Sequence, residues 1–169
     1  MSTPAPPVRD PAWSLSRSAI GLWVTQGAIG TVFWAAALLV FWLVVPGDAT
    51  AVPLLRWLGG AFVLLYGALA IGVRPQLRYR VHRWEVTGAA VYTLTGWLSR
   101  EWTLVPIARI QTVDVTRGAV QQVFGLASVA VMTASSQGTV RIPHLEADVA
   151  RRVAEDLAHR AESVRDEAT

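Results

Sequence analysis

Two long stretches in the first half of the chain consist almost entirely of apolar residues. Residues 20–45 contain no charged side chain, and residues 54–73 contain one, Arg56. A helix rises about 1.5 Å per residue and needs about 20 residues to cross a hydrocarbon core of about 30 Å. Both stretches are therefore long enough to span a membrane. Pro46 and Pro53 bound the short segment that connects them.

A signal peptide or a buried helix pair would account for these stretches less well. A secretory signal peptide has an apolar core of about 7 to 15 residues, which is shorter than the first stretch. A buried helix pair of a soluble protein would need a larger protein to cover its apolar surface on all sides. Arg56 lies one turn from the start of its stretch, where its guanidinium can reach the headgroups. The pattern predicts an N-terminal tail over residues 1–19 and a two-helix transmembrane hairpin over residues 20–73.

Small residues recur every four positions on both predicted helices, as Gly27, Thr31 and Ala35 on the first and Ala68 and Gly72 on the second. Small side chains at this spacing let two helix backbones approach closely in lipid. We expect these residues to pack the hairpin on itself. Dimerisation through the same faces is the alternative.

Positive residues gather directly after the second stretch. Four arginines lie within ten residues and no acid lies among them: Arg74, Arg78, Arg80 and Arg83. Positive residues near the ends of membrane spans favour the cytoplasmic side. We therefore expect a multi-pass protein of the cell membrane with both termini in the cytoplasm. The same arginines are candidates for contact with anionic lipid headgroups.

Beyond Arg74 the apolar period changes to short alternating segments with β-branched residues, which is typical of strands. Six strands are predicted, over residues 78–86, 89–95, 100–105, 109–116, 128–133 and 139–142. An amphipathic helix follows, whose apolar stripe is formed by Leu145, Val149, Val153, Leu157 and Ala161. We predict an α+β domain over residues 76–162, a small barrel or sandwich closed by its last helix, and a frayed tail over residues 163–169.

Two segments of this domain carry a family signature. Residues 106–113 read Pro-Ile-Ala-Arg-Ile-Gln-Thr-Val, and residues 123–129 read Val-Phe-Gly-Leu-Ala-Ser-Val. In order and spacing they resemble the signature of the bacterial pleckstrin-homology (PH) domain family, which commonly follows a hairpin of membrane helices. The resemblance implies a seven-stranded, strongly bent antiparallel sheet closed by a C-terminal helix. That is one strand more than the alternation predicts.

The residues of this signature have structural roles that need no ligand. Pro106 is expected to end a strand because it cannot donate to the ladder, and Gly125 to permit a positive φ. Arg109 and Gln111 are expected to hydrogen-bond backbone carbonyls at a corner of the sheet. The motif residues carried over from the family are Pro106, Arg109, Ile110, Gln111, Phe124, Gly125 and Leu126.

The sequence does not favour several functions. Eukaryotic PH domains suggest phosphoinositide binding by basic residues around the loop between the first two strands, but residues 86–89 contain none. The chain has no cysteine, and His82, His144 and His159 lack the spacing of metal ligands. We predict no metal, no cofactor and no catalysis. The pI of about 10.2 comes from 15 arginines against 12 acids, and we predict no nucleic-acid binding.

These observations together predict a non-enzymatic, membrane-anchored PH-like interaction module at the inner face of the bacterial cell membrane. The hairpin would hold the domain at the bilayer, and the sheet or its edge would recruit a protein partner or a second copy of the chain. The alternative is that the domain surface senses or binds anionic lipid. An enzyme acting on lipid or envelope substrates is a third possibility, for which the sequence offers no catalytic residues.

Overall fold

The computed structural model describes residues 9–47, 50–96, 99–133 and 138–167. The chain forms two compact units. The hairpin unit is Ile20–Leu77, and the domain unit combines the segment Met1–Ala19 with Arg78–Thr169. The domain is therefore assembled from chain on both sides of the hairpin, and each unit is described by itself below.

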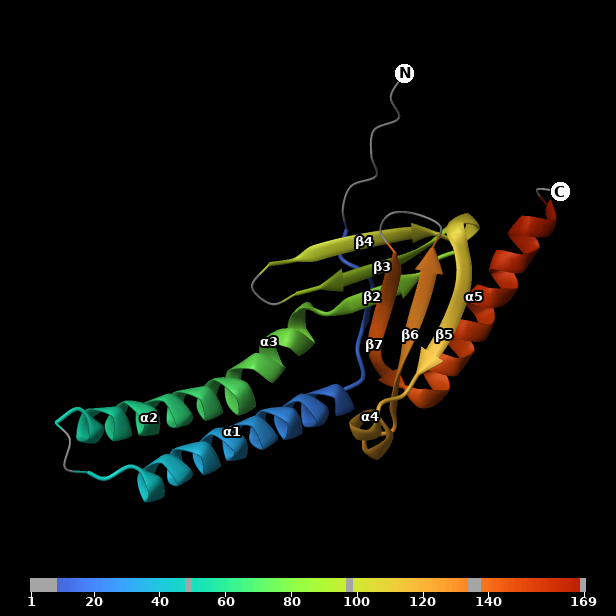
Figure 1. The fold of residues 1–169 in the computed structure, drawn as a ribbon. Coiled ribbons are helices and arrows are strands. Elements are labelled where there is room, and N and C mark those ends of the chain that lie inside the picture. Colours follow the sequence, from blue (N-terminus) through green and yellow to red (C-terminus); the bar gives the residue numbers. More distant parts are fainter. Residues whose placement is uncertain (1–8, 48–49, 97–98, 134–137, 168–169) are drawn as a thin grey trace. The chain divides into compact units, whose positions relative to one another are not determined.

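The hairpin unit is built from two long helices (Figure 1). Helix α1 is Ser18–Val44, and α2, Val52–Gly67, continues through a π-helical turn, Ala68–Val73, into α3, Arg74–Val81. Both helices are long and apolar enough to cross a membrane. The wider π turn ends two residues before Pro75, which lacks the N–H that a regular helix would use there.

The second helix extends eight residues beyond its predicted end at residue 73. The strand predicted over residues 78–86 is therefore wrong in its first half, because it begins at Arg83. The physical reason is that arginine, glutamine and leucine in α3 are good helix formers, so the helix continues past the end of the apolar stretch.

Small residues hold the two helices of the hairpin close together. A Cβ added to Gly27 would lie 2.5 Å from the carbonyl oxygen of Ala70, and one added to Gly67 would lie 3.1 Å from the Thr31 methyl group. Gly27 and Thr31 therefore pack the hairpin as predicted. On the second helix the prediction was wrong by a few positions, because Gly67 and Ala70 make the contact and a Cβ on Gly72 would meet no described atom within 4 Å.

Arg56 ties the start of α2 to the end of α1. Its Nη2 donates to the carbonyl oxygens of Val45 at 2.8 Å and of Trp42 at 3.2 Å, and its guanidinium lies 4.5 Å from the centroid of the Trp42 ring. The last carbonyls of a helix have no partner within the helix, so the arginine satisfies groups that apolar surroundings would leave unpaired.

The domain unit contains two antiparallel sheets and a C-terminal helix (Figure 1). One sheet has the order β1-β2-β3-β4 and the other the order β5-β6-β7. The strands are β1 Trp13–Ser14, β2 Arg83–Val86, β3 Ala90–Thr95, β4 Glu101–Pro106, β5 Ile110–Thr116, β6 Leu126–Thr133 and β7 Thr139–Glu146. The short helix α4, Ala119–Val123, lies between β5 and β6, and α5, Ala147–Glu167, packs on β5, β6 and β7.

Strand β1 is a strand that alternation did not predict. Trp13 pairs with Trp84 and Ser14 with Arg83, and the Trp84 indole N–H donates to the Ser14 carbonyl at 3.3 Å. Glu85 accepts hydrogen bonds from the Ala12 N–H at 3.0 Å and from Arg9. The prediction that residues 1–19 form a separate tail is therefore wrong for residues 9–19. A two-residue strand is too short to show an alternating pattern.

The core of the domain lies between β6 and the helix α5. Every residue from Leu126 to Val131 is buried, and the buried residues of α5 are Ala150, Ala154, Leu157 and Ala161. The predicted stripe was correct at Leu157 and Ala161, whereas Leu145 belongs to β7 and Val149 and Val153 are half-buried. Alanines let α5 approach the sheet more closely than valines would. The helix also continues through residues 163–167, so the prediction of a frayed tail from residue 163 is wrong for these five residues.

The hairpin contact gives a first prediction. Gly27→Ala should destabilise the hairpin by about 1 to 3 kcal/mol, because its methyl group would push against the backbone of Ala70. Gly72→Ala is the matched control and should leave stability unchanged or raise it by less than about 1 kcal/mol. The midpoint of denaturant unfolding in detergent micelles measures both. Equal midpoints for the two variants would contradict the described packing.

Candidate functional site

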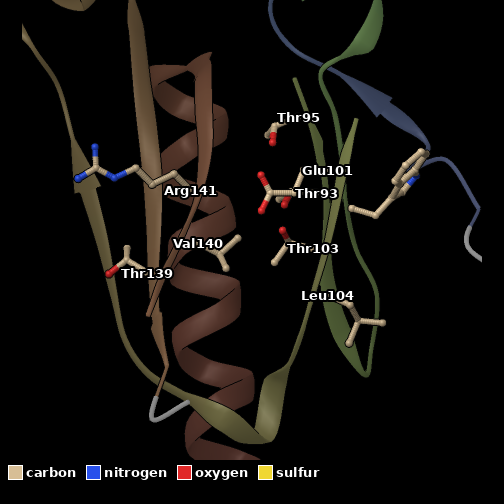
Figure 2. A pocket seen from close by; sticks show the side chains of 9 residues that line it. Thr93, Thr95, Glu101, Thr103, Leu104, Thr139, Val140 and Arg141 are labelled. Carbon is tan, nitrogen blue, oxygen red and sulfur yellow. The ribbon is translucent and has the colours of Figure 1, made fainter. Parts of the chain in front are cut away.

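A cleft of about 490 Å³ opens between the two sheets of the domain. Strands β3 and β4 line one side with Thr93, Thr95, Glu101 and Thr103, and β7 lines the other with Val140. Figure 2 shows Val140 and the Glu101 carboxylate pointing into the cleft from opposite sides, while Arg141 and Thr139 of β7 point away from it. The cleft is therefore polar on one wall and apolar on the other.

The register of β3 and β4 places the polar residues on one face. Thr93 is paired with Thr103 and Thr95 with Glu101, and directly paired residues share a face of the sheet. The same face continues to Val91 and Val105, which are 0% and 2% exposed. The face that forms the core at one end of these strands therefore changes to hydroxyls and a carboxylate at the other. These groups can donate and accept hydrogen bonds to a polar ligand or backbone.

The cleft also lies beside two strand edges. In the described part of the chain β4 pairs with β3 alone and β7 with β6 alone, and residues of both end strands line the cleft. A strand at the edge of a sheet offers a row of backbone N–H and C=O groups on its free side. The cleft therefore combines backbone donors and acceptors with the threonine hydroxyls and Glu101.

The alternation of polar and apolar residues does not distinguish these cleft residues from a solvent-facing set. Thr93 and Thr95 alternate with Tyr92 and Leu94, and a polar alternate set on a strand normally indicates a solvent face. Leu94, on the opposite face, is only 2% exposed. Alternation identifies the two faces of a strand but does not identify which face lines a cleft.

The family-motif residues lie at the ends of strands. Pro106 ends β4, as predicted, and Gly125 has φ +66°, also as predicted. Ile110 is 4% exposed at the start of β5, and Leu126, at the start of β6, is 0% exposed, while Phe124 between α4 and β6 is half-buried. These residues have structural positions and none of them lines the cleft.

The predicted hydrogen bonds of Arg109 and Gln111 are not observed. Both side chains are exposed, and neither makes a hydrogen bond within the described residues. The pairing of β5 with β6 shifts between Ile110 and Thr112, so Gln111 lies at an irregularity of the ladder. A bulge leaves its extra residue unpaired and turns it outward, which explains why the corner does not need these two side chains.

The four arginines after the second apolar stretch are spread over α3 and β2. Arg74 and Arg80 are exposed, and Arg78 and Arg83 are half-buried. Within the described ranges Arg74, Arg80 and Arg83 form no ion pair. Their charges are therefore not neutralised by acids of the described chain.

Two histidines that are far apart in the sequence lie near enough to influence each other's charge. His82 follows α3 and its Nδ1 lies 2.8 Å from the Arg78 carbonyl oxygen, and His144, in β7, has φ +53°. The His144 carbonyl accepts from the Ser16 N–H at 3.4 Å, and its Nδ1 lies 3.0 Å from Nε2 of Gln121. No group of three His, Cys, Asp or Glu side chains that could hold a metal gathers among residues 9–47, 50–96, 99–133 and 138–167.

Burial controls the charge of both histidines. Desolvation lowers the pKa of His82 from its usual 6.5. The hydrogen bond to the Arg78 carbonyl raises this pKa in part, and the positive charge of Arg78 lowers it again. Desolvation also lowers the pKa of His144 below 6.5, with smaller effects of the charges on His82 and Arg78. Both imidazoles therefore resist protonation in the folded domain.

This gives a pH prediction. In the unfolded chain His82 and His144 take up protons near pH 6.5, whereas in the folded domain their lowered pKa values keep them neutral to a lower pH. The domain is therefore fully stable above pH 6.5 and loses stability as the pH falls through and below that value. His144→Asn should make this loss smaller, since asparagine tolerates a positive φ and does not titrate. Melting temperatures in detergent at pH 7.5 and 5.5 measure the effect, with His159→Asn, an exposed site on α5, as the control. The idea fails if both variants lose as much stability as the unmodified chain.

Comparisons with known proteins agree with this architecture. The family model described as "Bacterial PH domain" matches residues 20–161. The "UPF0699 transmembrane protein YdbS" of Bacillus subtilis (strain 168) is 29% identical over 102 residues, which cover 60% of this chain and 63% of the relative. The chain thus matches less than two thirds of that relative's length. No solved structure matches.

The matched region includes both long apolar helices, β2 to β7 and most of α5. The antiparallel sheets followed by a C-terminal helix are consistent with the PH-like fold that the motif residues predicted, although the strands form two sheets of four and three strands. By its sequence, the chain belongs to the bacterial PH domain family.

Proposed function

We propose that the chain is a non-enzymatic, membrane-anchored module that recruits a protein partner, and that the partner enters the cleft between β4 and β7 as an extended segment. The observation that carries this proposal is the position of the cleft beside two end strands. An extended peptide added to a sheet edge gains main-chain hydrogen bonds for affinity and side-chain pockets for specificity. The polar residues of the cleft, which lie outside the family motif, would supply the side-chain contacts that give specificity.

The chemistry of the cleft indicates the kind of segment that fits. Glu101 contributes a carboxylate, the three threonines contribute hydroxyls, and Val140 contributes an apolar wall. A segment with a basic side chain that reaches Glu101 and small residues that face the threonines would satisfy these groups. Small side chains are favoured because the cleft has a volume of only about 490 Å³.

Membrane attachment by the hairpin rests on two observations. The two helices are long and apolar enough to span, and the matched relative carries the name of a transmembrane protein. The pairing of Ser14 with Arg83 adds a constraint, because it holds the chain before α1 beside the chain after α3. The hairpin must then leave and re-enter the domain on one side of the bilayer. The arginines of α3 and β2 favour the cytoplasmic side.

The anionic-lipid alternative is favoured by one observation. Arg74, Arg80 and Arg83 form no ion pair in the described part of the chain, and each basic residue near an anionic surface contributes about 1 kcal/mol of attraction. The same arginines also set the orientation of the hairpin. A fragment that starts at residue 76 would lack β1, so tests of lipid binding need the full chain.

A photo-crosslinking amino acid at position 103, inside the cleft, should capture a protein of defined mass in native membranes. The same group at Thr139, on the opposite rim but pointing away, is the matched control and should give no such product. Glu101→Arg should reduce the product at position 103 several-fold, because it reverses the one charge that points into the cleft. Gel mobility and mass spectrometry identify the product.

The outcomes separate the two proposals. A lipid adduct at position 103 in place of a protein adduct would favour lipid sensing. Equal yields at positions 103 and 139, or a yield that Glu101→Arg does not change, would contradict partner binding in the cleft. Recovery of a lone monomer from mild detergent would also count against recruitment.

The orientation gives a separate prediction. The chain contains no cysteine, so single cysteines report their own accessibility. Ala51→Cys, in the hairpin turn, should react with a membrane-impermeant maleimide on intact cells. Gly88→Cys, in the exposed turn between β2 and β3, should react only after the cells are opened. The reverse pattern would place the domain outside the cell.

A further inference from the structure

The loop that contains α4 exposes an apolar tip. Val123 is 83% exposed, more than any other large apolar side chain in the described part of the domain. Val120 and Phe124 are half-buried beside it. Residues 118–125 carry no charge, and no acid occurs from Thr116 to Leu145. The tip therefore lacks the charged side chains that normally solvate an exposed loop.

The tip is held in place by hydrogen bonds at its base. The Gln121 side chain accepts from the Gly118 N–H at 3.0 Å through Oε1, and its Nε2 donates to Oγ of Ser128 at 2.8 Å. The Gly125 carbonyl accepts from the Ala147 N–H at 3.0 Å. These bonds fix the loop to β6 and to the start of α5. Val123 is thus held outward by a fixed base, and the loop does not fold it back onto the domain.

The base of this loop is hydrogen-bonded to the passage that leads into α1 and lies within electrostatic range of the passage that leaves α3. Gln121 contacts His144, whose carbonyl accepts from the N–H of Ser16, two residues before α1 begins. His144 also interacts electrostatically with His82, the residue directly after α3. The loop is therefore linked to the end of the domain at which the chain passes into α1 and returns from α3. If the hairpin spans a bilayer, this is the end of the domain from which the membrane helices emerge.

We propose that the α4 tip inserts Val123, with Val120 and Phe124 behind it, into the interfacial layer of the membrane that holds the hairpin. The tip would then be a third attachment point that fixes the orientation of the domain over the bilayer. Arg117, just before the loop, and the arginines of α3 would face anionic headgroups around it. The inference rests on the hairpin crossing the membrane and does not depend on what enters the cleft.

The test uses the full-length chain in lipid nanodiscs that contain phosphatidylcholine and phosphatidylglycerol. Because the chain has no cysteine, an environment-sensitive fluorophore can be attached at Val123→Cys alone. We expect blue-shifted emission, strong quenching by nitroxide-labelled lipid and weak quenching by aqueous iodide. Gly88→Cys is the matched control in the exposed turn after β2, five residues along the chain from Arg83, and should show the opposite quenching pattern.

Two further measurements keep the outcome clear. A probe at Val32→Cys, in α1, tests whether the hairpin lies in the bilayer and should be quenched by nitroxide lipid. If this probe is not quenched, the proposal that the hairpin spans the membrane fails. If only the Val123 probe is not quenched, the insertion of the tip fails. In the unlabelled chain, Val123→Asp should speed amide hydrogen exchange of residues 119–124 several-fold in discs and leave the β2–β3 turn unchanged. A Val123 probe that behaves like the Gly88 probe, or unchanged exchange, would overturn the inference.

Discussion

The structure of the domain depends on the pairing of two short strands that the hairpin separates in sequence. Trp13 and Ser14 lie before the first long helix, and their partners Trp84 and Arg83 lie after the second. Because backbone hydrogen bonds form only between neighbouring strands, the chain must return to its starting point after the hairpin. The hairpin is therefore an insertion between the first two strands of one sheet, and its two ends are held together by the domain itself.

Each of the two units has stabilising contacts of its own. The hairpin is stabilised internally by small residues such as Gly27 and by the bonds from Arg56 to the end of α1. The domain is stabilised by the buried strand β6 and the alanine face of α5. The cleft residues and Val123, which are the candidate functional groups, contribute to neither of these two sets of stabilising contacts. The cleft lies where the shared face of β3 and β4 changes from valine to threonine, and Val123 lies on an exposed loop between β5 and β6.

The sequence predicted those features that depend on many residues at once. The two apolar stretches identified the hairpin, alternation identified six strands, and the motif around Pro106 and Gly125 identified the family. It did not locate β1, because a strand of two residues carries no period. It missed the cleft because Thr93 and Glu101 resemble solvent-facing residues until the register of β3 and β4 is known. It missed the histidine pair because His82 and His144 are brought together only by the fold.

The pairing of β1 with β2 can be tested directly by a disulfide, since the natural chain has no cysteine. Directly paired residues of antiparallel strands have Cα atoms about 4.5 to 5.5 Å apart, within the range that a disulfide spans. The measurement is the yield of intramolecular disulfide in the Ser14→Cys, Arg83→Cys double variant in native membranes under mild oxidation. We expect near-complete formation, and little in a Ser14→Cys, Val115→Cys control whose second cysteine lies in the other sheet. Equal, low yields in both would show that the domain is not assembled across the hairpin.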